Sequence, residues 1–217
     1  MKILCWFLFV CLGGFLFTGC GKVKNKNLAQ DYYKMSVLEL EETSSGAACR
    51  HSLQYINLAL EHEVSPHYLA HKATLLFLLN QKEESLSCFK RLLKLRMLPT
   101  VRAEIENNYA CLLAKCGKME QAKQIFEGLE KNKNYLTPQV ALVNLAKIYL
   151  EGGEHLFARQ RLERAVELAP DYVDAHYYLG LVCFSSGKHD LALQSLERTI
   201  DLEPGHSGAL ALRSRIS

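Results

Sequence analysis

Two histidines have the spacing that comes closest to a metal site. His67 and His71 are four residues apart, so a helix would place both imidazoles on one face, where they could share a metal ion. No glutamate follows the first histidine, as the metalloprotease pattern requires, and no third ligand is evident. We therefore expect surface or groove histidines, and we predict no metal site and no cofactor.

Nucleophilic chemistry has no better candidate in this chain. Serine, aspartate and histidine residues are scattered, without the nucleophile elbow of a hydrolase and without a glycine-rich phosphate loop. The balance of 26 Lys and Arg against 23 Asp and Glu gives a formal net charge of +3. This charge is too small to indicate the strongly basic surface that binds nucleic acid. We predict no catalytic residue, no enzymatic activity and no nucleic-acid partner.

The spacing of the cysteines does not indicate a set of disulfides or a metal site either. Cys111 and Cys116 are five residues apart on an expected helix, which separates them by about 140° around the axis. That angle suits neither a disulfide nor shared metal ligation. After Cys20 we expect mainly buried free thiols, because cysteine packs as a small hydrophobic residue. These are Cys49, Cys88, Cys111, Cys116 and Cys183.

The start of the chain has the features of an export signal. Lys2 precedes an apolar run from Ile3 to Phe17, which is shorter than the roughly 20 residues of a spanning helix. The sequence Phe17-Thr18-Gly19-Cys20 then resembles the lipobox of bacterial lipoproteins. By that resemblance, residues 1–19 are a signal peptide, and Cys20 carries a thioether-linked diacylglyceryl group that anchors the protein in a membrane. The alternative is an uncleaved membrane anchor.

The resemblance to lipoproteins also suggests the membrane in which the protein is located. Gly21 stands where an aspartate tends to retain such proteins at the inner membrane, so we expect an outer-membrane lipoprotein that faces the periplasm. Residues 20–27 are polar and basic, and we expect them to form a flexible lipidated tether.

A repeated pattern organises the rest of the chain between residues 139 and 204. The pattern occurs twice, and each residue of the first copy has its counterpart 34 residues later, in the second copy. The counterparts are Leu145 and Leu179, Ala146 and Gly180, Gly153 and Gly187, Ala158 and Ala192, Leu162 and Leu196, and Pro170 and Pro204. A fixed period of this length indicates a repeat architecture.

This pattern resembles the tetratricopeptide repeat (TPR) family, in which each repeat of about 34 residues forms two antiparallel helices. The resemblance implies an all-α fold, a right-handed solenoid of helix pairs. Small residues such as Ala146 and Ala158 would let the two helices of a pair approach closely. Gly153 would adopt the left-handed conformation that ends a first helix, and Pro170 would stop a second helix.

The same pattern divides the remaining chain. We expect repeats at residues 66–102, 103–138, 139–172 and 173–206. In the first repeat Asn80 replaces the turn glycine, and Pro99 is expected to stop the second helix. Residues 28–65 would form a degenerate repeat or N-terminal cap, with helices at 28–43 and 47–63 and Gly46 in the turn. Residues 207–217 would form a C-terminal capping helix whose N-cap is Ser207.

The TPR resemblance also predicts a binding surface. In such solenoids the first helix of each pair lines a concave groove that binds a protein or peptide. By repeat position, the candidate partner-binding residues are His71, Phe77, Asn107, Asn108, Val140, Val143, Asn144, Lys147, Tyr177 and Tyr178. Asn108 and Asn144 occupy equivalent positions, and their amides both donate and accept hydrogen bonds, which suits the backbone of an extended peptide. The basic clamp for acidic C-terminal tails is absent, because Ala70, Val140 and Asn144 stand at its positions.

A closer resemblance suggests a role. The sequence Asn107-Asn108-Tyr109-Ala110, followed by a similar turn, is similar to the lipid-anchored TPR proteins of type IV pilus biogenesis, the pilotins. It implies a scaffold that helps to assemble an envelope machine, such as a pilus or a secretion secretin. The alternative is an adaptor for enzymes that build or maintain the cell wall.

Overall fold

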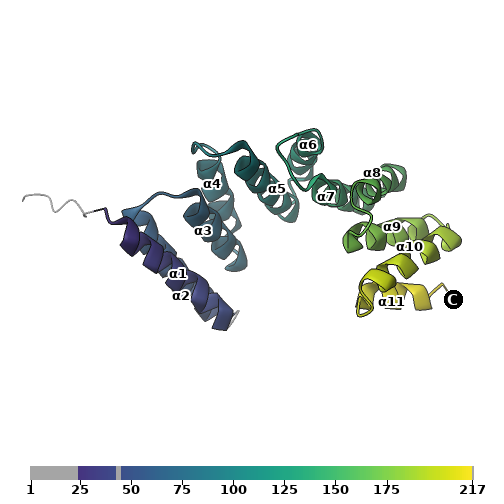
Figure 1. Cartoon of the computed structure of the whole chain (residues 1–217), viewed down its shortest axis with the longest axis horizontal. Helices are drawn as coiled ribbons and strands as arrows, with labels where there is room; N and C mark the ends of the chain where they lie inside the picture. Colours follow the sequence, from purple (N-terminus) through teal and green to yellow (C-terminus); the bar gives the residue numbers. More distant parts are fainter. Residues whose placement is uncertain (1–23, 43–44, 217) are drawn as a thin grey trace, which may run out of the picture. The chain divides into compact units, whose positions relative to one another are not determined.

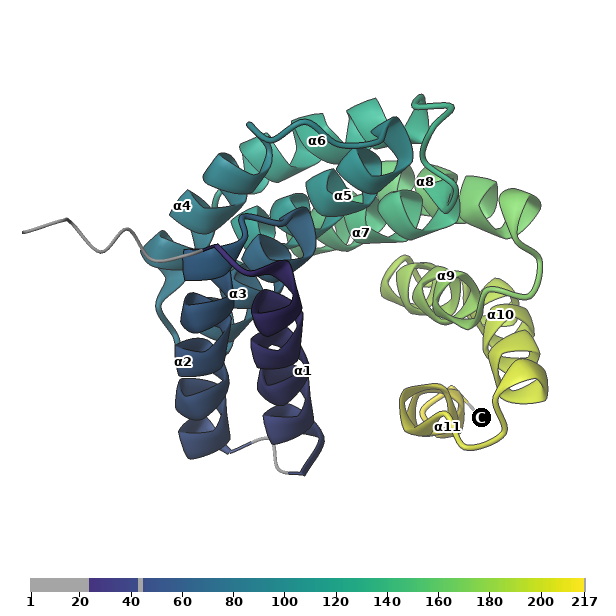
Figure 2. The same ribbon diagram turned by 60° about the vertical axis from the view of Figure 1, so that its left-hand side comes forward.

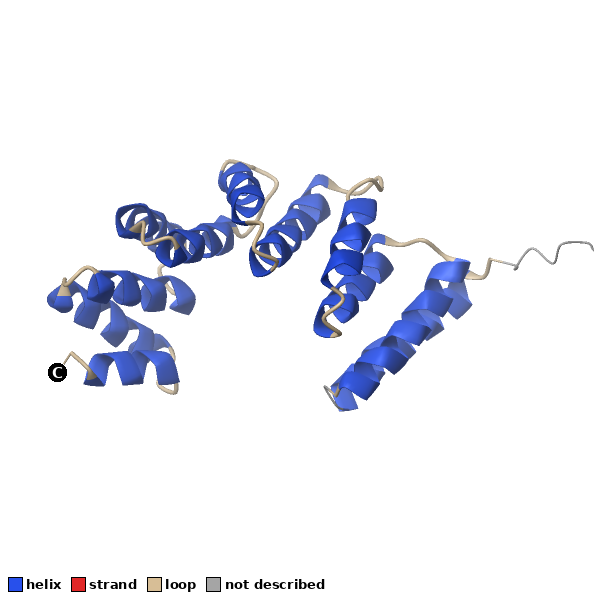
Figure 3. Ribbon diagram, turned by 180° about the vertical axis from the view of Figure 1, so that it is seen from behind, coloured by secondary structure: helices blue, strands red, loops and turns tan. Residues whose placement is uncertain are grey.

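The computed structural model describes residues 24–42 and 45–216, and these residues form eleven helices and connecting loops, with no strand (Figure 3). The all-α expectation is therefore confirmed for this part of the chain. The predicted signal peptide and Cys20 lie outside the described residues. The chain divides into two compact units, the first ending at Ser65 and the second beginning at Pro66.

Unit 1 is a hairpin of two helices, α1 (Lys26–Glu42) and α2 (Gly46–His62), which overlap in Figure 1 and are seen side by side in Figure 2. Gly46 was expected in the turn but is the first residue of α2, because Ser45 caps this helix and its side chain accepts a hydrogen bond from Ala48 N at 3.1 Å. Ser36 and Ser52 are fully buried between the helices. Their hydroxyls lie 2.8 Å apart, and each also donates to the backbone carbonyl of the other residue.

Unit 2 contains the other nine described helices. They are α3 (Pro66–Leu78), α4 (Lys82–Leu92), α5 (Pro99–Lys115), α6 (Met119–Glu130), α7 (Pro138–Glu151), α8 (His155–Leu168), α9 (Val173–Ser185), α10 (His189–Leu202) and α11 (Ser207–Ser214). We call α3, α5, α7 and α9 the first helices and α4, α6, α8 and α10 the second helices. Each first helix packs on the second helix that follows it, and each second helix also contacts the next odd-numbered helix. As a result α5, α7 and α9 lie next to one another.

The turn from each first helix to its second helix has the same geometry in all four pairs. Asn80, Gly117, Gly153 and Gly187 have φ values of 60°, 76°, 74° and 71°. In each case the next residue donates its backbone N–H to a carbonyl in the last turn of the first helix, as in Gln81 N to Leu76 O at 2.8 Å and Glu154 N to Tyr149 O at 2.8 Å. Asparagine tolerates this left-handed conformation better than most residues other than glycine, so the expectation for Asn80 is confirmed.

Small residues lie where the two helices of a pair meet. Ala146 on α7 and Ala158 on α8 are fully buried, as are Ala110 on α5 and Ala122 on α6. At the equivalent place on α9 the approach is closer still, since a Cβ atom added to Gly180 would lie 2.8 Å from Leu196 Cγ. Leu196 is fully buried in the core, so a methyl group at position 180 would force this side chain or the helix to shift.

Two further helix boundaries differ from the expectation. Helix α4 ends at Leu92, and Pro99 does not stop it but begins α5, because a proline at the first helical position loses no hydrogen bond and has a suitable φ. The first helix of the 103–138 repeat therefore begins before the expected boundary. The N-cap of α11 is His206 rather than Ser207, and its imidazole Nδ1 accepts a hydrogen bond from Ala209 N at 3.0 Å.

Gly180→Ala tests the tight approach of α9 and α10. We expect it to destabilise the protein by about 1–3 kcal/mol, because the added methyl group overlaps with the buried Leu196. Gly128→Ala in α6 is the matched control, since its Cβ would meet nothing within 4 Å, and there alanine should stabilise the helix by up to about 1 kcal/mol. Urea unfolding of both variants measures the difference, and an equal effect of the two substitutions would contradict this packing.

Candidate functional site

The candidate site is the surface of the first helices that does not pack against the second helices, which we call the first-helix face. Figure 2 shows α9 and α11 on the inner side of the bend in unit 2, with α10 on its outer side. Most of the candidate residues are at least partly exposed on this face: His71, Phe77, Asn108, Val140, Asn144, Lys147, Tyr177 and Tyr178.

Two of the candidate residues are not accessible. Val143 is 1% exposed, so the prediction that it lines this face is wrong. The reason is the central position of α7, which contacts α5, α6, α8 and α9 and leaves only a narrow strip of its surface exposed. Asn107 is 7% exposed, and it lies beneath the face rather than on it.

The buried Asn107 links two neighbouring first helices. Asn144 Nδ2 on α7 donates to Asn107 Oδ1 on α5 at 3.4 Å, and Asn107 Nδ2 donates to Asn108 Oδ1 at 3.5 Å. Asn144 Nδ2 also lies 3.4 Å from Cys111 Sγ. Asn108 and Asn144, which occupy equivalent repeat positions, are joined through Asn107. These amide hydrogen bonds are long, since N–H···O bonds in proteins cluster near about 2.9–3.0 Å.

Two lysines on this face lie over aromatic rings. Lys147 Nζ on α7 is 4.3 Å from the ring centroid of Tyr178 on α9, and Lys115 Nζ on α5 is 5.1 Å from that of Phe77 on α3. At exposed sites a cation–π contact is worth about 0.5–1 kcal/mol, which favours these positions of the two ammonium groups. Within the described part of the chain, neither lysine forms an ion pair with a carboxylate.

Tyr177 is partly a structural residue. Its ring lies 4.5 Å from that of His206 and 5.1 Å from that of Tyr178. A Cβ atom on Gly208 would come within 2.8 Å of its hydroxyl, so α11 packs closely against it. Tyr177 therefore joins α9 to α11 and also presents an edge to the first-helix face.

Tyr135, in the connection between α6 and α7, is a residue of this region that sequence reasoning did not select. It is 4% exposed, and its hydroxyl has no hydrogen-bond partner among the described residues. Burial raises the pKa of the Tyr135 phenol, the hydrogen-bonding side chain of Thr137 beside it lowers this pKa, and the charges of Glu104 and Cys111 raise it further. Thr137, however, directs its own hydroxyl toward Glu104, at 3.4 Å. The one available signal was the length of the expected repeat 103–138, which has 36 residues where the next repeat, 139–172, has 34, so that the connection carrying Tyr135 is longer.

Tyr172, in the connection between α8 and α9, lies in the same region as Tyr135. Burial, together with the charge and hydrogen bond of Asp174, raises the pKa of Tyr172 to about 12, and Tyr135 and Tyr178 add to this shift. Tyr172 Oη donates to Asp174 Oδ2 at 3.5 Å. Tyr172 is therefore protonated throughout the physiological range, and it serves as a hydrogen-bond donor beside the first-helix face.

Burial makes three of the cysteine thiols harder to deprotonate. Burial raises the pKa of Cys111, although the positive charges of Lys115 and Lys147 and a backbone hydrogen bond oppose this shift. Burial likewise raises the pKa of the Cys88 and Cys183 thiols. Cys49, Cys88 and Cys183 are buried free thiols, as expected, whereas Cys111 and Cys116 are only partly buried.

The histidine pair does not gain further ligands in the structure. His67 is exposed and His71 is half-buried on α3. Within residues 24–42 and 45–216, no group of three or more histidine, cysteine, aspartate or glutamate side chains is placed to hold a metal ion. Among the helices of the same residues, none is long and apolar enough to span a membrane.

A family model gives the first comparison with known proteins. The model described as tetratricopeptide repeat matches residues 141–207, which span α7 to α10 and the start of α11. Among proteins of curated function, none matches the chain in sequence.

Solved structures extend the likeness over most of the chain. The pilF protein of Pseudomonas aeruginosa is 16% identical, with a TM-score of 0.71 over 88% of this chain and 83% of that one. A fragment of MamA from Desulfovibrio magneticus RS-1 is 20% identical, with a TM-score of 0.64 over 83% and 98%. YrrB, described as a TPR protein with an unusual peptide-binding site, is 19% identical, with a TM-score of 0.58 over 88% and 94%. At these identities the likeness concerns the fold, which is that of a TPR solenoid.

Proposed function

We propose that this protein is a non-enzymatic scaffold that binds a protein partner on its first-helix face. The observation that carries the proposal is the linked set of side chains that crosses α5, α7 and α9. Asn108, Asn107 and Asn144 form one part of this set, and Lys147 and Tyr178 continue it onto α9. Amides with long internal hydrogen bonds have capacity left for a peptide backbone, and the aromatic rings suit apolar side chains.

The architecture favours this use of the surface. Helix-pair repeats stack into an extended face on which successive repeats can each contribute a contact, so a long segment of a partner can be bound. YrrB, a TPR protein of similar fold, is described as having an unusual peptide-binding site. A peptide or protein segment is therefore the ligand class that we propose for this chain.

We further propose that the scaffold is anchored in the outer membrane through Cys20 and faces the periplasm, where it helps to assemble an envelope machine such as a type IV pilus or a secretion secretin. The sequence around Cys20 and the Asn107-Asn108-Tyr109 segment support this role, as does the similarity of fold to pilF. The second candidate, an adaptor for cell-wall enzymes, follows from the same fold and anchor and differs only in the partner.

Photocrosslinking tests the face. We expect p-benzoylphenylalanine at Asn108 or Val140, which lie on α5 and α7, to capture the partner in cells. The same group at Gln124 or Gln160, exposed residues on the second helices α6 and α8, is the control and should capture much less. Mass spectrometry of the products separates pilus or secretin components from wall enzymes. Equal capture from both sets of positions would contradict the proposal.

Lipid labelling tests the anchor. Cys20→Ser should abolish incorporation of labelled palmitate and release the protein from membranes, because the thioether needs the thiol of Cys20. Cys116→Ser, which removes a partly buried thiol at the end of α5, is the matched control and should keep both label and location. Label retained in the Cys20→Ser variant would refute the anchor.

A further inference from the structure

The segments around the α4–α5 and α6–α7 connections carry an excess of positive charge. Residues 85–103 contain five lysine or arginine residues and no acid, and residues 131–150 contain three and again no acid. The connections that follow, 169–172 and 203–206, each contain an acid and neither lysine nor arginine. Since the whole chain has a formal net charge of only +3, the positive charge is gathered locally.

Four of these cations are exposed and lack an acidic partner. Lys94 and Arg96 lie in the first connection, and Lys131 and Lys133 in the second, all of them exposed. None of the four forms an ion pair with a carboxylate of residues 24–42 or 45–216, although several other lysines and arginines there do. Like charges on one surface repel each other, and a nearby anionic surface relieves that repulsion.

The two connections lie at the same end of α5. The guanidinium of Arg102 donates to Leu93 O at 2.8 Å and to Leu95 O at 3.1 Å, which holds the first connection against the start of the helix. Two residues further along α5, the Glu104 carboxylate accepts a hydrogen bond from the Thr137 hydroxyl of the second connection at 3.4 Å. Both connections are therefore held in place by side chains from the first turns of α5.

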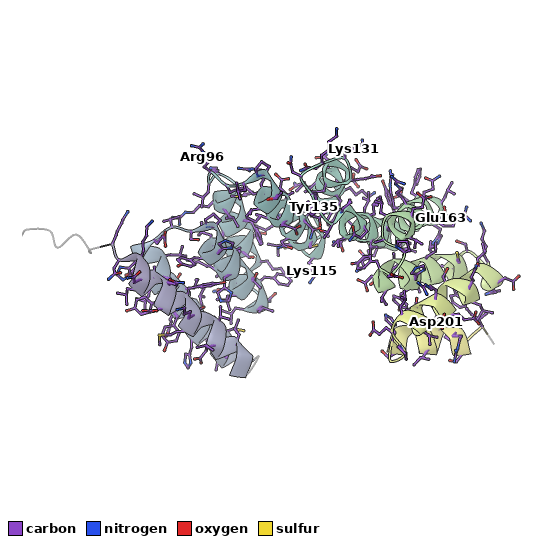
Figure 4. All side chains as sticks on the ribbon, in the orientation of Figure 1. Arg96, Lys115, Lys131, Tyr135, Glu163 and Asp201 are labelled. Atoms are coloured by element: carbon purple, nitrogen blue, oxygen red, sulfur yellow. The ribbon has the colours of Figure 1, made fainter. Side chains whose placement is uncertain are left out.

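Figure 4 shows the resulting position of the cations. Arg96 and Lys131 lie along one margin of unit 2, whereas Lys115, at the other end of α5, lies away from that margin. We call this margin the basic edge and define it as residues 93–98 and 131–137.

Each connection also exposes a leucine close to its cations. Leu98 is 69% exposed and Leu136 is 74% exposed, the two highest values among the large hydrophobic residues that the structure describes. The buried ring of Tyr135 and the hydrogen bond from Tyr135 N to Asn132 O at 2.9 Å fix the connection beside Leu136. Exposed apolar side chains among cations are typical of segments that lie at a membrane interface, where cations meet headgroups and apolar groups enter the boundary with the acyl chains.

We propose that the basic edge is a docking surface for an anionic lipid bilayer. Its cations contact the lipid phosphates, and Leu98 and Leu136 enter the interface. An acidic protein fits less well, because the core of a protein interface is depleted of lysine, whereas here each leucine stands among cations.

Docking through the basic edge complements the proposed anchor at Cys20. A single lipid chain binds a membrane reversibly, and a polybasic surface supplies a second attachment. Without the anchor, the contact of the edge is reversible and sensitive to salt. The edge is separate from the first-helix face, and its contact fixes the orientation of that face relative to the bilayer.

A fluorescent probe in the basic edge tests the proposal. The environment-sensitive amino acid Anap replaces Leu98 or Leu136 in the full chain, which is reconstituted in vesicles of phosphatidylcholine alone or of three parts phosphatidylcholine and one part phosphatidylglycerol. Anap in place of Leu156, which is 61% exposed beside the turn at the other end of α7, is the positional control. We expect a blue shift of the emission at positions 98 and 136 in the anionic vesicles, little shift at position 156, and loss of the shift at high salt.

Matched charge variants sharpen the test. Arg96→Glu/Lys133→Glu should abolish the shift of both probes, because the reversed charges are repelled by anionic headgroups. Lys82→Glu/Lys188→Glu changes the net charge equally at two exposed lysines beside the turns between first and second helices, and it should keep the shift.

The outcomes separate the basic edge from the anchor and from a protein-binding surface. If the chain stays attached to the anionic vesicles but neither probe shifts, the edge is refuted while the Cys20 anchor stands. An equal shift at Leu156, or a shift that survives Arg96→Glu/Lys133→Glu, also refutes the edge. If vesicles cause no shift and p-benzoylphenylalanine at Leu98 captures an acidic protein in cells, the edge binds a protein instead.

Discussion

The close approach of the two helices in each pair is the contact on which the rest of unit 2 depends. It requires a very small residue on each side, as at Ala146 and Ala158, and no Cβ at all at Gly180. Because the contact recurs at the same sequence spacing in the last two pairs, each pair meets the next in the same way. The stacked pairs then bury apolar surface that no single pair could bury alone.

The candidate site follows from this stacking. When second helices occupy one side of the row, α5, α7 and α9 must lie next to one another on the other side. Residues far apart in the sequence thereby meet, as Asn107 does with Asn144 and Lys147 with Tyr178. The site needs no loop rearrangement to form, since helices position nearly all of its side chains. Tyr135, which a loop contributes, is buried and so also held in place.

The repeat pattern predicted much of this arrangement, because a period and its turn residues are local signals. The resemblance to the TPR family implied the helix pairs, and the turn residues Asn80 and Gly153 are left-handed as their repeat position predicted. Boundaries set by capping could not: Pro99 suits the start of a helix as well as it follows the end of one, and His206 caps α11 through a ring nitrogen that pattern rules do not consider. The burial of Val143 and the unpaired hydroxyl of Tyr135 depend on several helices packing together, which no single repeat reveals.

Hydrogen–deuterium exchange of the full chain, alone and with its crosslinked partner bound, tests the central claim most directly, namely that the first helices form the working face. The account predicts that the partner slows exchange in α5, α7 and α9, over residues 99–115, 138–151 and 173–185, and leaves α6 and α8 unchanged. Slowed exchange confined to α6 and α8, or to α1 and α2 of unit 1, would contradict it.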